Sequence, residues 1–181
     1  MSSAFETARL SLRLVRQSDR ADLIALEQDP EVMRFLNGGK PTPEEGGRAD
    51  FLMPRGGEPD VWVAFEKSNG GFIGWFILHA TEPGAAELGF RLHREVWGRG
   101  LATEGCQALM AKGFGEFGLE RIIASTMAVN LRSRRLLERL GLRHSRTVLG
   151  NWTEPIPGNE HGDVDYEITR QEWQKRSPAA I

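Results

Sequence analysis

The chain is poor in cysteine, in long apolar runs and in surplus charge of either sign. Its 181 residues include one cysteine, Cys106, so no disulfide can form within the chain, which predicts a reducing, cytoplasmic location. No run of 18 apolar residues occurs and the start lacks the apolar core of a signal peptide, so we expect neither a membrane span nor export. The net charge of −2 argues against a nucleic-acid or membrane-surface binder.

The length and composition indicate one globular domain. A chain of 181 residues with 40% hydrophobic and 27% charged residues can bury a core of its own without disulfides or a structural metal. No internal repeat and no linker interrupts it, so we treat residues 1–181 as a single domain. The sequence leaves the oligomeric state open, a homodimer included.

Alternating apolar residues predict strands at residues 8–15, 87–92 and around 164–168, and two apolar runs on either side of a hairpin turn predict strands at 60–66 and 72–79. Strands are also expected at 121–127 and 142–149. Helices are expected after Ser18, from Pro30, over residues 42–53, 100–117 and 130–140, and after Thr169. The three central strands follow one another without crossover helices, which excludes a doubly wound fold. The order predicts a mixed α/β (α+β) protein.

One segment has the make-up of a ligand-binding turn. A strand ending at Leu92 leads through the glycine-bearing residues 97–103 into a helix. Glycine lets the backbone approach a ligand closely, and the first turn of a helix offers unpaired amides to an anion. Thr103 occupies the third glycine position of a dinucleotide-binding fingerprint, and no segment matches a P-loop. Spacing alone leaves two interpretations, a phosphate site or a structural turn.

Several motifs, in the right order over about residues 7–174, carry a resemblance to a known family: TARLSLRLVRQSD, DPEVMRFL, ELGFRL, NLRSRRLLERLGL and EHGDVDYEITRQEW. With them, the chain resembles the GNAT superfamily of N-acetyltransferases, and within it the ribosomal-protein N-terminal acetyltransferases. The resemblance implies a mostly antiparallel central sheet of about seven strands flanked by helices. It also implies acetyl transfer from acetyl-CoA to a primary amine.

The resemblance implies where acetyl-CoA binds. The family's signature places Gln or Arg three residues before a Gly, and Gly or Ala two residues after that Gly; here Trp97 replaces the Gln or Arg. The matching cradle for the diphosphate is Trp97, Gly98, Arg99, Gly100, Leu101, Ala102 and Thr103. The pantetheine arm would pair through the main chain with the strand that carries Phe90, Arg91 and Leu92.

Acetyl transfer also needs a base for the amine, and Glu87, on the same strand, is our candidate, directly or through water. The alternative is that Glu87 is a surface strand residue. His161 with Asp163 is a second candidate for the base. His161, Asp163 and Asp165 are spaced like metal ligands, but a metal is not expected there, because three ligands along one short strand make a poor tetrahedral site.

The departing thiolate is the last requirement. Many members of the superfamily protonate it with a helix tyrosine, but Leu137 occupies that position and the only tyrosine is Tyr166. The ribosomal-protein group instead shows a serine three residues after an asparagine, which Asn130 and Ser133 match. Asn130 would then bind pantetheine or cap the helix, and Ser133 would lie near the sulfur or be a neutral helix residue.

The acceptor is the least readable part of the sequence. We expect a primary amine, either a protein N-terminus or a small molecule such as an aminoglycoside, a polyamine or an amino acid. A third alternative is an acyl-CoA-binding module without turnover. Trp62, Trp75 and Trp97 either line an acceptor groove or pack in the core, and Cys106 is expected to be a packing residue.

Overall fold

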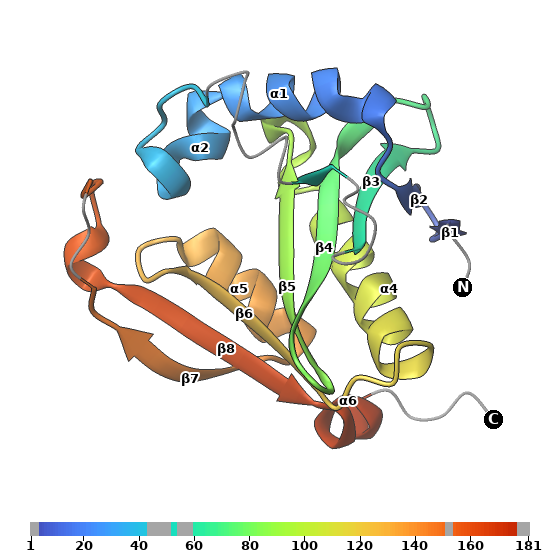
Figure 1. The fold of residues 1–181 in the computed structure, drawn as a ribbon, viewed down its shortest axis with the longest axis vertical. Helices are drawn as coiled ribbons and strands as arrows, with labels where there is room; N and C mark the ends of the chain where they lie inside the picture. Colours follow the sequence, from blue (N-terminus) through green and yellow to red (C-terminus); the bar gives the residue numbers. More distant parts are fainter. Residues whose placement is uncertain (1–3, 43–51, 54–59, 151–153, 177–181) are drawn as a thin grey trace.

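A computed structural model of the chain describes residues 4–42, 52–53, 60–150 and 154–176. Its strands form one eight-stranded sheet in the order β1-β2-β3-β4-β5-β6-β8-β7 (Figure 1). The strands are β1 (Ala4–Glu6), β2 (Leu10–Leu14), β3 (Asp60–Glu66), β4 (Phe72–Glu82), β5 (Ala85–Leu92), β6 (Arg121–Met127), β7 (Arg143–Val148) and β8 (Asp163–Thr169). All neighbours are antiparallel except β5 and β6, which are parallel.

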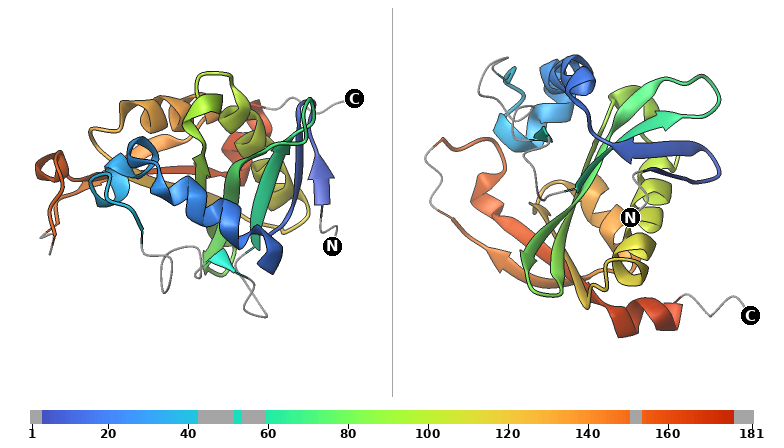
Figure 2. Two further views of the ribbon diagram at one scale, coloured as in Figure 1. Left: turned by 90° about the horizontal axis from the view of Figure 1, so that it is seen from above. Right: turned by 45° about the vertical axis from the view of Figure 1, so that its right-hand side comes forward.

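The helices cover the two faces of the sheet unequally. They are α1 (Arg20–Gln28), α2 (Pro30–Asn37), α4 (Leu101–Gly115), α5 (Leu131–Leu140) and α6 (Arg170–Arg176), with 3-10 turns η1 (Gln17–Asp19), η2 (Arg94–Val96) and η3 (Asn159–His161). Figures 1 and 2 show α4 and α5 along one face, while α1 and α2 lie across one end of the other. The described helices therefore leave much of the face over β6, β7 and β8 uncovered.

Two apolar clusters follow from this arrangement. The larger one packs α4 and α5 onto the sheet through residues such as Phe76, Leu88 and Leu109. The smaller one packs α1 and α2 onto β3 and β4, with Leu23 and Trp75 among its buried residues. Alternate residues of β3 and β4 thus enter opposite clusters, as expected for strands covered on both faces.

The expected fold class is confirmed, and most expected elements are present within a few residues. The count of about seven strands was one too low, because the three-residue β1 is too short for alternation to reveal and exists through its pairing with β2. Strand β4 continues to Glu82 and β5 begins at Ala85, so their hairpin is longer than expected. The helix expected over residues 42–53 lies almost wholly outside the described residues.

The parallel pair β5 and β6 is short, and this shapes the molecule. Only Ala85, Ala86 and Glu87 pair with β6, facing Arg121, Ile122 and Ile123. Beyond Glu87 the strands diverge, as Figure 1 shows, so the backbone edge of β5 that faces β6 has no strand partner in the described structure. No helix among the described residues is both long and apolar enough to cross a bilayer.

Candidate active site

The glycine-bearing turn and the first turn of α4 present main-chain N–H groups that have no acceptor among the described residues. Gly98 and Gly100 have φ of 76° and 80°, a left-handed conformation that glycine adopts without steric cost. Glu104 is the first residue of the helix whose amide finds a main-chain acceptor, the carbonyl of Gly100, at 3.1 Å. In the described structure, no amide from residues 98–103 donates to a protein acceptor. These donors, at the positive end of a 15-residue helix, can bind a diphosphate.

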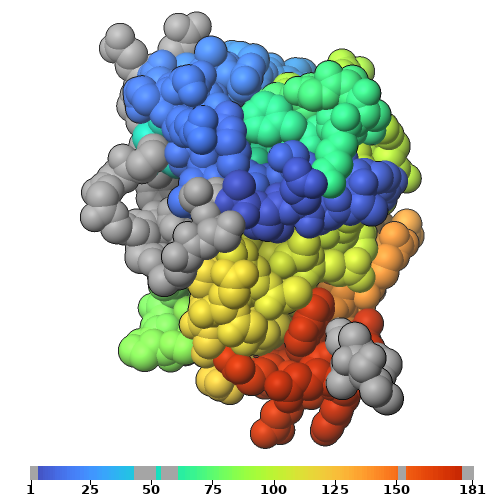
Figure 3. All heavy atoms as spheres, turned by 90° about the vertical axis from the view of Figure 1, so that its right-hand side faces the viewer, coloured from blue at the N-terminus to red at the C-terminus, as the bar shows by residue number. Residues whose placement is uncertain are grey.

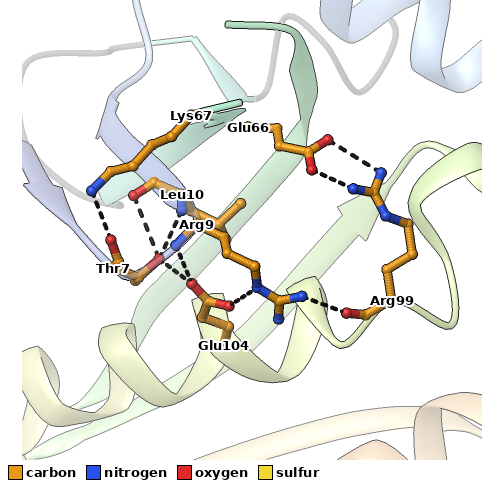
Figure 4. Close-up of polar contacts among 7 residues, drawn as sticks. All are labelled: Thr7, Arg9, Leu10, Glu66, Lys67, Arg99 and Glu104. Atoms are coloured by element: carbon orange, nitrogen blue, oxygen red, sulfur yellow. Dashed lines mark hydrogen bonds and ion pairs between the residues drawn. The ribbon is translucent and has the colours of Figure 1, made fainter. Parts of the chain in front are cut away.

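The side chain of Arg99 does not point toward these N–H groups. Its guanidinium forms an ion pair with Glu66 of β3, whose side chain is 8% exposed (Figure 4). Arg99 therefore ties the turn to the sheet, and the predicted contribution of residue 99 to the cradle reduces to its main chain.

Trp97 ties the same turn to the end of β5. Its indole N–H donates to the carbonyl of Leu92 at 2.8 Å. The guanidinium of Arg132, at the start of α5, lies 4.7 Å from the centroid of the Trp97 ring. The residue that departs from the family signature thus connects the cradle, β5 and α5.

The predicted pantetheine strand, β5, directs its side chains to the two faces of the sheet. Its main-chain edge beyond Glu87 faces the side from which β6 has diverged. Leu92 is buried, and Phe90 packs against Phe76 with ring centroids 6.4 Å apart. Arg91 faces the other way, pairs with the buried Glu27 of α1 and lies 5.3 Å from the centroid of the Trp75 ring. None of these side chains is needed for strand-like pairing, which uses only the backbone.

Glu87 lies where β5 and β6 begin to separate, on the face opposite α4. It lines a depression of about 480 Å³ formed with β6, β7 and β8. Its carboxylate forms no hydrogen bond or ion pair with any other described residue, which leaves it available to an incoming amine. Its direct cross-strand neighbour on β4 is His79, whose Nδ1 is buried and has no hydrogen-bond partner among the described residues. The sequence alone did not single out His79, although alternation across the β4–β5 hairpin would have suggested it.

The depression carries charges of both signs. Asp165 forms an ion pair with Arg146 at 2.6 Å, and Glu167 lies 3.4 Å from Arg121. Three carboxylates and two arginines therefore line it, and only Glu87 among them is unpaired within the described residues. Such a surface suits an acceptor with mixed charge better than a polycation.

Asn130 and Ser133 lie together at the start of α5. Asn130 caps the helix, because its Oδ1 accepts the amide of Ser133 at 3.2 Å and its Nδ2 donates to Thr126. The capping alternative for Asn130 is thus confirmed, while contacts of either residue with acetyl-CoA remain predictions. Leu137, at the position of the family tyrosine, is buried in the core.

The competing candidates lie elsewhere. His161 lines a second depression with Arg134 and His144, and Glu87 does not line it.

Trp62 and Trp75 are 1% and 2% exposed, so the interpretation that they line an acceptor groove was wrong. Burial raises the pKa of the Cys106 thiol, as for a packing residue. Among the described residues, no group of three or more His, Cys, Asp or Glu is arranged to hold a metal.

Comparison with known proteins connects this geometry to a family. Residues 9–143 match the sequence profile of the acetyltransferase (GNAT) domain. A protein of Aspergillus fumigatus named FsC-acetyl coenzyme A-N(2)-transacetylase is 33% identical, over 92% of this chain and 76% of its own length.

Solved structures share the fold at lower identity. A spermidine N-acetyltransferase from Vibrio cholerae, in complex with CoA and spermine, matches 92% of this chain and 99% of its own, with a TM-score of 0.77 and 17% identity. The ribosomal L7/L12 α-N-protein acetyltransferase RimL, in complex with coenzyme A, matches 90% of this chain and 95% of its own, with a TM-score of 0.74 and 20% identity.

Proposed function

The chain belongs to the GNAT family of N-acetyltransferases and uses acetyl-CoA as its acetyl donor, and from that premise we propose that its acceptor is an α-amine. The observation that carries the proposal is a single arrangement. The main-chain amides of residues 98–103 follow the end of β5, and the carboxylate of Glu87 lies on β5 where its pairing with β6 ends; both are unpaired within the described residues.

Each group of residues at this site has its own role. Residues 97–103 hold the diphosphate, and the backbone of residues 90–92 holds the pantetheine arm in an extended conformation. The thioester supplies the activated acetyl group. A main-chain N–H of β5 stabilises the oxyanion that develops on the carbonyl, because it is fixed in place before the reaction. Glu87 accepts the proton of the attacking amine. As the new C–N bond forms, the thioester C–S bond breaks and CoA leaves as a thiolate, near which Ser133 would lie.

An α-amine suits a site with one unpaired carboxylate. An amine with a pKa near 8 is about one-tenth neutral at pH 7, whereas one near 10.4 is under roughly 0.1% neutral. The α-amine therefore needs less help from a base. Two of the three carboxylates that line the depression in the described structure are paired with arginine, which suits a polyamine or an aminoglycoside less well. The N(2) in the name of the Aspergillus relative supports the same class of acceptor.

The acceptor class is tested by thiol release from acetyl-CoA with matched amines. We expect release with alanine amide and with a short peptide that has a free N-terminus. Nα-acetyl-lysine, whose only free amine is at the end of the side chain, should give little. Peptide turnover would favour a protein N-terminus, and turnover of the amide alone would favour a small molecule. Release with spermidine or kanamycin and not with α-amines would refute the proposal.

The role of Glu87 is tested by Glu87→Gln. Loss of a positioned base should lower kcat about 100-fold or more while the Kd for acetyl-CoA stays the same. Glu167→Gln is the matched control, because it removes the same charge from the same depression at a carboxylate already paired with Arg121. A kcat for Glu87→Gln equal to that of the control would remove Glu87 as the base.

A further inference from the structure

The N-terminal segment of the chain reaches the cradle through a chain of polar contacts (Figure 4). Glu104, in the first turn of α4, accepts the hydroxyl of Thr7 at 2.5 Å, the amide of Arg9 at 2.8 Å and the Nε of Arg9 at 2.6 Å. Burial by itself would raise the pKa of Glu104, but these donors lower it, so the carboxylate is charged at neutral pH. Figure 3 shows the N-terminal residues as a band between the β3–β4 hairpin and α4.

The second arm of the Arg9 guanidinium holds the turn itself. Its Nη1 donates to the carbonyl of Arg99 at 2.8 Å. A trans peptide is planar, so its C=O and the following N–H point in opposite directions. With the carbonyl of Arg99 directed to Arg9, the amide of Gly100 is directed away from it, and that amide has no protein acceptor in the described structure.

We infer that Arg9 is a positioning residue for acetyl-CoA: by holding the carbonyl of Arg99, it turns the amide of Gly100 toward the diphosphate. The inference rests on the proposed cradle at residues 97–103. Glu104 orients the guanidinium for this task, and the ion pair of Arg99 with Glu66 holds the turn from the side of β3. The conformation of the cradle is thus set by residues about 90 positions away in the sequence.

An ordinary structural ion pair would behave differently. The side chain of Arg9 is 49% exposed, and ion pairs of this exposure contribute little to the free energy of unfolding. A structural role therefore predicts a small change in stability and an equal effect on every donor substrate. A positioning role predicts a loss restricted to donors that carry the diphosphate.

The test compares acetyl-CoA with S-acetylpantetheine, which has the thioester arm but no diphosphate. We expect Arg9→Gln to lower kcat/KM for acetyl-CoA about tenfold and to leave that for S-acetylpantetheine within twofold of wild type. Arg13→Gln is the matched control, since Arg13 lies on β2, the strand that follows Arg9, and pairs with an acid, Asp19, away from the cradle. It should leave the ratio of the two donors unchanged.

Arg9→Lys separates orientation from simple charge attraction. Lysine keeps the positive charge but lacks the planar fork that spans Glu104 and the carbonyl of Arg99. If Arg9 acts by orientation, Arg9→Lys retains most of the defect with acetyl-CoA. Full rescue by lysine would overturn the inference, and so would equal losses with both donors.

The same assay distinguishes this inference from the proposed cradle. If the wild-type enzyme used both donors with equal kcat/KM, residues 97–103 would not bind the diphosphate and the cradle itself would fail. If the wild-type enzyme preferred acetyl-CoA and Arg9→Gln kept that preference in full, only the role of Arg9 would fail. Thermal unfolding of each variant shows that the compared proteins are folded.

Discussion

Replacing Gly100 by alanine tests the cradle most directly. Gly100 has φ of 80°, and a Cβ there would lie 3.4 Å from Nη2 of Arg9. The side chain would thus press on the arginine behind the turn instead of filling the diphosphate site. For a residue other than glycine, the left-handed conformation costs about 1–2 kcal/mol. The variant must therefore either bear this strain or rotate the peptide that presents the amide of Gly100.

The two responses have different signatures. Strain alone would lower Tm by roughly 2–8 °C for a chain of this size. Rotation would cost a hydrogen bond to a charged phosphate, about 1.5–3 kcal/mol, and so raise the Kd for acetyl-CoA about 10- to 100-fold. We expect Gly100→Ala to show the second effect in calorimetric titration.

Gly70→Ala is the matched control for the strain. Gly70 lies in the β3–β4 hairpin with φ of 69°, and a Cβ there would meet no atom within 4 Å. It should lower Tm by a similar amount and leave the Kd for acetyl-CoA unchanged. A Kd for Gly100→Ala within twofold of wild type, with a Tm like that of Gly70→Ala, would refute the reasoning.

Three further predictions concern stability and reactivity. Gly105→Ala should destabilise the protein by about 1–3 kcal/mol, because its Cβ would lie 2.3 Å from the ring of Phe76, whereas Gly115→Ala on the same helix has open space and should be neutral or stabilising in urea unfolding. Cys106 should resist a thiol reagent until the protein unfolds, since its thiol is buried and its pKa is raised by burial; rapid labelling of the native enzyme would contradict this. Burial opposes ionisation of Asp19, but hydrogen bonds from arginine hold its pKa below the usual value, so its contribution to stability is present above about pH 4 and is lost as pH falls through the lowered pKa. Asp19→Asn should therefore be less stable than wild type at pH 7, and the difference in the free energy of unfolding should shrink as pH falls through the lowered pKa; a constant difference would contradict the pairing.

Much of the fold was predictable because its signals are local. Two apolar runs on either side of a glycine-bearing turn marked β3 and β4, and a capping asparagine with a terminal glycine marked the bounds of α5. The three-residue β1 was not predictable, because its hydrogen bonds come from β2 and not from its own sequence.

The candidate site divides in the same way. The glycines at 98 and 100 indicated the cradle, since few other residues tolerate positive φ. The place of His79 opposite Glu87 and the contact of Arg9 with the carbonyl of Arg99 were missed, because the first depends on strand register and the second on a contact across the fold.

The sequence by itself determined the family and the donor, and it predicted the position of the cradle, because short motifs carry this information in a few neighbouring residues. The tertiary structure alone decided which side chains contact the cradle and which pack in the core. Arg99 turned to Glu66, Trp62 and Trp75 became buried, and Glu87 remained without a partner among the described residues. Those outcomes depend on which strands become neighbours and where β5 parts from β6, and pairing between distant strands leaves little trace in any one segment.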